Sequence, residues 1–174
     1  MGARSSSEAF ERALLPHLDA AYNLARWLTR NGDDAEDVVQ EAFVRALRFF
    51  GGFHGGNARA WLLAIVRNAC YDWLRRNRPA EAHEELDEEV HGASEPSPTA
   101  EDLLVERVDR VRLQRALEEL PPAFREVLIL REFEGLSYKE IAEVAGVKIG
   151  TVMSRLARAR DALQRQLIAE GGKR

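Results

Sequence analysis

Apolar residues recur at intervals of three and four along most of the chain, which is the spacing of amphipathic α-helices. Residues 8–31 carry one such stripe, and Pro16 predicts a kink within it because proline lacks a backbone N–H. The pair Asn31-Gly32 predicts the end of this segment. A helix is predicted over 33–48, because its acidic first residues suit the positive end of a helix dipole. Its predicted buried side consists of Val38, Val39, Ala42, Phe43, Ala46 and Leu47.

The middle of the chain combines a loop, a long helix and a linker. Residues 49–57 contain four glycines and three phenylalanines, so they predict a loop. A long helix is predicted over 58–78, ended by a proline. Residues 80–102 are acidic and poor in apolar residues, which predicts a flexible linker. Nothing alternates with period two, so we predict an all-α protein of two small helical domains, 8–79 and 103–170.

The second predicted domain has four helices, and the last two form a helix-turn-helix over 137–160. Ser137 and Glu140 have the spacing of a capping box, which starts a helix. Gly146 stands where the chain must turn, at a position that favours a left-handed backbone. The predicted buried stripe of the second helix consists of Ile149, Val152, Leu156, Ala159 and Leu163.

The other side of that second helix is predicted to face solvent with cations and small hydrogen-bonding groups. Gly150 lies in its first turn, where a missing side chain would let a phosphate come close. This composition suits a recognition helix in the DNA major groove, although two amphipathic helices with a solvated basic face have the same pattern. The residues predicted to face outward are Lys148, Thr151, Ser154, Arg155 and Arg158.

The net charge of −4 hides an uneven distribution. Residues 1–80 carry +2 and residues 103–174 carry +3, whereas residues 81–102 hold nine acids and neither lysine nor arginine. The acidity is therefore confined to the predicted linker. The two parts that flank it are weakly basic, which is compatible with binding to nucleic acid.

Several function classes are not expected from this sequence. A single cysteine, Cys70, excludes an internal disulfide and fits a buried position in a reducing cytoplasm. No apolar run approaches the ~18 residues of a membrane span, and the N-terminus lacks the apolar core of a signal peptide. His54 has no partner at ligand spacing, so no metal is expected. No nucleophile–base pair or phosphate loop stands out, so neither an enzyme nor a cofactor is expected.

The first domain offers two candidate faces. The outward side of 33–48 is acidic and then basic, and charge alone indicates a solvated surface. One narrow side of 58–78 combines small residues, an amide, an aromatic ring and arginines, on which a nucleic-acid strand could lie. We expect Trp61 and Trp73 to pack in the core and Asp72 to pair with an arginine. The residues of the narrow side are Ala60, Ala64, Arg67, Asn68, Tyr71, Arg75 and Arg78.

Two blocks of the sequence resemble a known family. The first resembles region 2 of bacterial sigma factors and comprises residues 34–48 (DAEDVVQEAFVRALR) and 56–68 (GNARAWLLAIVRN). The second resembles region 4 and comprises residues 120–131 (LPPAFREVLILR) with the helix-turn-helix. Their order, with no region 3 domain between them, is similar to that of the extracytoplasmic-function (ECF) sigma factors.

The resemblance implies roles for the first domain. In the family, the helix that matches 34–48 docks on the clamp helices of the large subunit of core RNA polymerase. The implied polymerase-binding residues are Glu36, Asp37, Gln40, Glu41 and Arg45. The loop matching 51–57 and the helix matching 58–78 open the promoter minus-ten element and capture a flipped base. The implied minus-ten residues are Asn57, Arg59, Trp61, Arg67, Asn68, Tyr71 and Arg75.

The resemblance also implies that the helix over 148–160 reads the minus-thirty-five element as duplex DNA. The implied residues are Lys148, Gly150, Thr151, Ser154, Arg155 and Arg158, with Lys148 and Arg155 at bases or adjacent phosphates. This sequence departs from the family at Lys148, where proline is common, and at Met153, where a basic residue is frequent. An anti-sigma partner, a cytoplasmic location and a linker that runs toward the RNA exit path are implied as well; no homo-oligomer is expected.

Two other functions remain open at the level of the sequence. An ordinary helix-turn-helix regulator would bind duplex DNA as a dimer without polymerase, and would leave 34–48 and 51–78 without a role. A helical interaction protein would have no nucleic-acid function, so reversing the charge of Arg155 would leave transcription unchanged.

Overall fold

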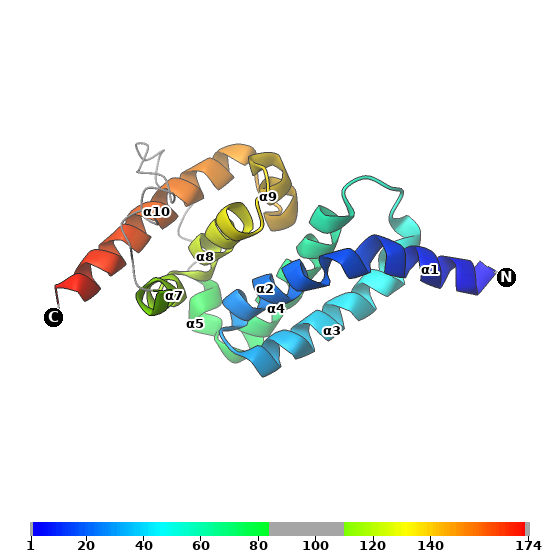
Figure 1. Cartoon of the computed structure of the whole chain (residues 1–174), viewed down its shortest axis with the longest axis horizontal. Coiled ribbons are helices and arrows are strands. Elements are labelled where there is room, and N and C mark those ends of the chain that lie inside the picture. The colour runs from blue at the N-terminus through cyan, green and yellow to red at the C-terminus, as the bar shows by residue number, and fades with distance from the viewer. Residues whose placement is uncertain (1, 84–109, 173–174) are drawn as a thin grey trace.

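The computed structural model describes residues 2–83 and 110–172, which form helices joined by turns (Figure 1). The first domain consists of α1 (Gly2–Leu14), η1 (Leu15–His17), α2 (Leu18–Thr29), α3 (Gly32–Phe49), η2 (Phe50–Gly52), α4 (Ala58–Asn77) and α5 (Pro79–His83). The second consists of α7 (Arg110–Glu118), α8 (Pro122–Leu128), the π-helical turn η4 (Ile129–Phe133), α9 (Tyr138–Ala145) and α10 (Ile149–Gly171). The predicted all-α class is confirmed within the described residues.

Local sequence signals place most helix ends of the first domain. The predicted kink at Pro16 is confirmed, because this residue lies in the 3-10 turn between α1 and α2. The predicted role of Asn31 is wrong: α2 ends at Thr29, and its C-cap is Arg30, with φ of 59°. Asn31 instead caps α3, since its side chain accepts hydrogen bonds from the backbone N–H groups of Asp33 and Asp34.

The chain after α4 does not enter a linker at once. Pro79 begins α5 rather than closing the ordered part, because proline is well tolerated in the first turn of a helix. The predicted linker therefore starts too early, since residues 80–83 are helical. The rest of the predicted linker, 84–102, and the start of the next predicted helix, 103–109, lie outside the described residues.

The helix-turn-helix is built as its sequence predicts. The capping box is confirmed: the Ser137 hydroxyl accepts from the Glu140 N–H, and the Glu140 carboxylate accepts from the Ser137 N–H. Gly146 ends α9 in the left-handed region at φ of 68°, also as predicted. α10 then packs its inner side against α7, α8 and α9.

The two domains lie against each other. In Figure 1, α8 and α9 of the second domain adjoin α2 and α4 of the first, and packing between α4 and α9 and between α2 and α8 supports that view. The buried apolar residues of both domains form one continuous core. This contact positions polar residues of the second domain on the surface of α4 on which a nucleic-acid strand was predicted to lie.

Candidate nucleic-acid and polymerase interfaces

The start of α4 and the loop before it form the first candidate site. Asn57 caps the helix, with its side-chain oxygen accepting from the Ala60 N–H at 3.0 Å. Gly55 and Gly56 have φ of 87° and 94°, a backbone conformation that favours glycine, and so let the loop turn into the helix. The loop is anchored by Phe53, whose ring centroid lies 5.1 Å from that of Trp61.

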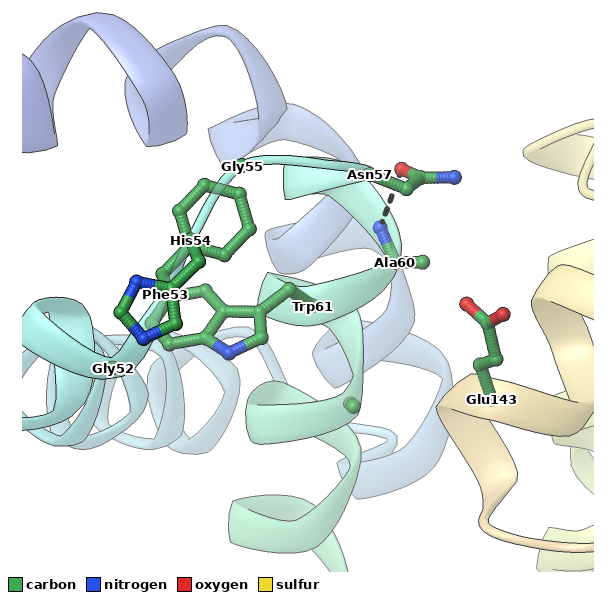
Figure 2. A pocket seen from close by; sticks show the side chains of 9 residues that line it. Gly52, Phe53, His54, Gly55, Asn57, Ala60, Trp61 and Glu143 are labelled. Atoms are coloured by element: carbon green, nitrogen blue, oxygen red, sulfur yellow. Dashed lines mark hydrogen bonds between the residues drawn. The ribbon is translucent and has the colours of Figure 1, made fainter.

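A surface pocket of about 380 Å³ lies between this loop and α4 (Figure 2). Phe53, His54 and Trp61 line one side of it, and Asn57 lies at its edge. Glu143 of α9 faces the pocket from the second domain, as Figure 2 shows. An aromatic wall beside an amide and a carboxylate can stack against a flat ring and hydrogen-bond to its edge.

Further along α4, Arg67 and Tyr71 meet a carboxylate of the second domain. Arg67 Nε donates to Glu126 Oε1 at 2.8 Å, and the Tyr71 hydroxyl donates to Glu126 Oε2 at 3.1 Å. The Arg67 guanidinium also lies 3.9 Å from the centroid of the Tyr71 ring. Glu126 is fully buried, and Arg67 and Tyr71 are 9% and 1% exposed. The prediction that this side of α4 is an exposed surface is therefore wrong for both residues, because α8 covers them.

The N-terminal end of α4 meets a second carboxylate. Asn57 Nδ2 donates to Glu140 Oε2 at 2.6 Å, and Arg59 Nη2 lies 3.4 Å from the same oxygen. Arg59 Nη1 also donates to the backbone carbonyl of Glu134 at 3.2 Å. The backbone N–H of Ser137, with Asn57 and Arg59, lowers the pKa of Glu140 to about 2. Glu140 thus serves both as an N-terminal cap of α9 and as an anion for α4.

Arg125, the neighbour of Glu126, joins the ends of helices from the two domains. Its guanidinium donates to the carbonyl of Trp27 at 2.7 Å, to that of Leu120 at 2.8 Å and to that of Leu117 at 3.2 Å. Carbonyls at helix C-termini have no partner within the helix, so a buried cation satisfies them. Burial lowers the pKa of Arg125 to about 10, which leaves the side chain charged at neutral pH.

Two minus-ten candidates remain on the surface of α4. Asn68 is exposed, and Arg75 is exposed while paired with Asp72 at 2.9 Å. Asp72 also pairs with Arg45 of α3 at 2.9 Å, which confirms that Asp72 has arginine partners. Trp61 and Trp73 are half-buried and packed against the core, as predicted. Cys70 is fully buried as predicted, and burial raises the pKa of its thiol.

The candidate polymerase face lies along α3. Glu36, Asp37 and Gln40 are exposed, and Glu41 is half-buried and paired with Arg45 at 2.8 Å. The face also carries an apolar side chain that the helical pattern had assigned to the core: Leu47 is 59% exposed. That expectation was wrong because Leu47 directly follows the fully buried Ala46, so its side chain points about 100° round the helix from the buried side.

The outward face of α10 differs from its prediction at two positions. Arg155 was expected to face outward, but it is 6% exposed. It follows Val152 by three residues and precedes Ala159 by four, so it shares their buried side of the helix. Ile149 was assigned to the buried stripe, but it lies at the first position of α10 and is 46% exposed. Lys148 and Gly150 are exposed, whereas Thr151, Ser154 and Arg158 are half-buried.

Sequence reasoning missed the second-domain residues that cover α4. Glu126 and Arg125 lie between the apolar residues Phe124 and Val127, and charged residues inside an apolar run are a signal of buried pairing. Glu140 was recognised only as part of a capping box. Within the described residues, no cluster of His, Cys, Asp and Glu side chains could hold a metal ion, and no helix is long and apolar enough to span a membrane.

Comparison with known families matches both domains. The model described as Sigma-70 region 2 matches residues 14–80, and the one described as Sigma-70, region 4 matches residues 110–163. The chain is 36% identical to the ECF RNA polymerase sigma factor SigE of Mycolicibacterium smegmatis over 94% of its own length, and it spans 63% of that relative. It is 33% identical to the RNA polymerase sigma-H factor of Pseudomonas aeruginosa, covering 94% of this chain and 89% of the relative.

Two solved structures share the fold. The sigma factor RpoE of Bartonella quintana, in complex with the anti-sigma factor NepR, aligns with a TM-score of 0.70 and 31% identity, covering 94% of this chain and 99% of that one. CnrH, in complex with the cytosolic domain of CnrY, aligns with a TM-score of 0.67 and 30% identity, covering 97% and 95%. The chain therefore belongs to the extracytoplasmic-function (ECF) sigma factors, the specificity subunits that bind core RNA polymerase and promoter DNA.

Proposed function

We propose that this chain docks on core RNA polymerase through α3, opens the promoter minus-ten element with the pocket and α4, and reads the minus-thirty-five element with α10. The main support is that one chain combines a helix-turn-helix with an aromatic pocket and an arginine-bearing helix, in the order of the two matched family models. The chain supplies no catalytic group in this proposal, and it acts in the cytoplasm, where it assembles with polymerase.

The polymerase site in this proposal consists of Glu36, Asp37, Gln40, Glu41 and Arg45. The exposed Leu47 adds apolar area beside these charges, which suits a protein partner better than a nucleic acid. Replacing Glu41 with lysine is expected to weaken binding to core polymerase, measured by titration of a labelled chain. Unchanged affinity would remove α3 from the proposed interface.

The minus-ten site in this proposal consists of Asn57, Arg59, Trp61, Arg67, Asn68, Tyr71 and Arg75. A base can be read on its Watson–Crick edge only after it leaves the stack, which costs a few kcal/mol. The pocket beside Trp61 would stack the extruded base, while the arginines hold the strand. Asn68→Ala is expected to impair promoter opening more than duplex binding. Equal losses of promoter opening and of duplex affinity in Asn68→Ala would argue against a role of Asn68 in reading the extruded base.

The arrangement of the domains bears on the same site. Four of the seven residues contact groups of the second domain, through the Glu126 carboxylate, the Glu140 carboxylate and the Glu134 carbonyl. DNA phosphates are anions that would compete for the same arginines. We infer that α8 and α9 must leave α4 before the melted strand can bind. Anti-sigma binding, as in the solved complex of RpoE with NepR, would then control how often the domains separate.

The minus-thirty-five site in this proposal consists of Lys148, Gly150, Thr151, Ser154 and Arg158. Arg155 is assigned a different role, because its side chain is buried: it positions α10 rather than touching a base. The half-buried Arg158 lies within reach of a phosphate at the edge of the groove. The linker is proposed to run toward the RNA exit path of polymerase, where its negative charge would resemble nucleic acid.

Transcription in vitro tests the proposed function as a whole. The full chain is mixed with core RNA polymerase and a pool of templates with randomised promoters, and the transcripts are sequenced. Enrichment of templates that share two elements at fixed spacing is the expected result. An ordinary helix-turn-helix regulator predicts no co-elution with core polymerase in gel filtration and no enriched start sites.

A further inference from the structure

The first half of α10 carries an apolar outward face. Met153 is 53% exposed and Ile149 is 46% exposed, while the cation expected at this face, Arg155, is buried. Gly150, the third exposed residue of these two turns, has no side chain at all. The part of the helix that would enter the major groove therefore presents methyl and thioether groups at its surface.

Ile149 and Met153 lie four residues apart, so their side chains are neighbours on one side of the helix. The core does not require them, because α10 packs inward through other residues, which include Val152, Leu156 and Ala159. In helix-turn-helix proteins the N-terminal residues of the second helix contact base edges. The two apolar side chains thus lie where bases would be read.

Promoter DNA suits this face better than a protein partner does. Lys148 is exposed directly before Ile149, and Lys139 is exposed in the first turn of α9 of the same helix-turn-helix. A stable protein interface buries about 800 Å² on each partner, far more than two side chains supply. A small apolar patch beside cations instead matches a groove whose edges are phosphates and whose floor carries isolated apolar groups.

The major groove offers one such apolar group, the 5-methyl of thymine. Building on the proposed function, we propose that Met153 and Ile149 specify thymine in the minus-thirty-five element by packing against its methyl groups. Neither side chain can donate a hydrogen bond, so this part of the face selects bases by apolar contact and shape. In this proposal, the hydrogen-bonding and charged residues on either side contact the sugar-phosphate backbone of the DNA.

Removing the methyl groups from the DNA tests this inference directly. Duplexes are first selected from a pool with a randomised minus-thirty-five region, using holoenzyme assembled from the full chain and core polymerase. Each thymine of a selected duplex is then replaced by uracil, which lacks the methyl and keeps every hydrogen-bonding group. We expect one or two replacements to weaken binding about fourfold each, the loss expected for one buried methyl.

Variants then assign the effect to a side chain. The double variant Met153→Ala with Ile149→Ala is expected to bind the thymine and uracil duplexes equally, and each single alanine variant is expected to lose part of the preference for thymine, whereas Met153→Leu keeps it. Ile168→Ala is the matched control, because Ile168 is 67% exposed on the same helix and lies about 22 Å further along its axis. This control variant is expected to keep the full preference for thymine.

Four results would overturn the inference. Selected duplexes that bind equally with uracil would reject methyl reading while leaving the proposed function intact. A preference for thymine that survives in full in the double alanine variant would assign it to other residues. Self-association of the full chain that Met153→Ala abolishes would assign the patch to a second copy. If the holoenzyme selects no duplex, the proposed function itself fails, and the inference fails with it.

Discussion

The two surfaces proposed to meet DNA differ in chemistry and in exposure. The α4 surface carries several arginines and Tyr71, and carboxylates of the second domain cover part of it. The outward face of α10 is largely apolar at its centre and remains exposed. The charged surface can be covered because anionic side chains match the cations that would hold a DNA strand. The apolar face has no charge that a carboxylate could match, and Ile149 and Met153 are exposed while the domains are closed.

The largest effect is expected from removing the buried Glu126 carboxylate, which contacts α4. Glu126→Ala removes the carboxylate that the buried Arg67 and Tyr71 share, which is expected to destabilise the closed arrangement by about 3–5 kcal/mol. The domains should then separate, and the radius of gyration measured by small-angle X-ray scattering should increase. Arg160→Ala is the matched control, because it breaks an ion pair with Glu132 inside the second domain. An unchanged radius of gyration for Glu126→Ala would show that the Glu126–Arg67 ion pair does not hold the second domain against α4.

A second test addresses the helix ends that Arg125 joins. Lysine keeps the charge but cannot donate in several directions, so Arg125→Lys is expected to cost about 3 kcal/mol of unfolding free energy. Urea denaturation measures the loss. Arg131→Lys is the control, since Arg131 donates to the Leu136 carbonyl within the second domain and its replacement should cost about 1 kcal/mol. Equal losses of unfolding free energy for Arg125→Lys and Arg131→Lys would show that the hydrogen bonds of Arg125 between the domains contribute no additional stability.

Lowering the pH should weaken the contacts that Glu140 of α9 makes with Asn57 and Arg59. Its pKa is lowered to about 2 in the folded chain from an ordinary value of 4.5, so its contribution is complete above about pH 4.5 and disappears as the pH falls toward 2. We expect the cap and the contacts to Asn57 and Arg59 to contribute about 1 kcal/mol. Thermal unfolding of Glu140→Gln between pH 2 and 5 should lack this part of the pH dependence. Glu143→Gln, exposed on the same helix, serves as the control, and identical profiles for all three proteins would reject the assignment.

The smallest expected effect concerns the exposed surface. A Cβ added at Gly150 would have no atom within 4 Å, so the fold itself does not require glycine there. Gly150→Ala is expected to stabilise α10 by up to about 1 kcal/mol and to weaken duplex binding, because the methyl would stand between the helix and the DNA backbone. Calorimetry and anisotropy titrations measure the two changes. Stabilisation without loss of affinity would mean that DNA does not approach this position closely.

The sequence by itself determined the helices, the kink at Pro16, the capping box of Ser137 and Glu140, and the left-handed turn at Gly146. These features depend on residues within four positions of one another, whose spacing reflects the geometry of a single helix or turn. Local spacing predicted burial wrongly for Arg155 and Ile149, which lie at the edge of the apolar side of α10. Whether a residue at that edge is buried depends on the helices that pack beside it.

Only the tertiary structure decided that Glu126 meets Arg67 and Tyr71, and that Glu140 meets Asn57 and Arg59. These partners are separated by 55 to 83 positions along the chain, and no periodic pattern connects residues so far apart. Each partner also has an ordinary local explanation, as a helix cap or a helix-surface charge. Their meeting depends on how two separately patterned domains pack, and that packing is set by the shapes of whole surfaces rather than by the order of neighbouring residues.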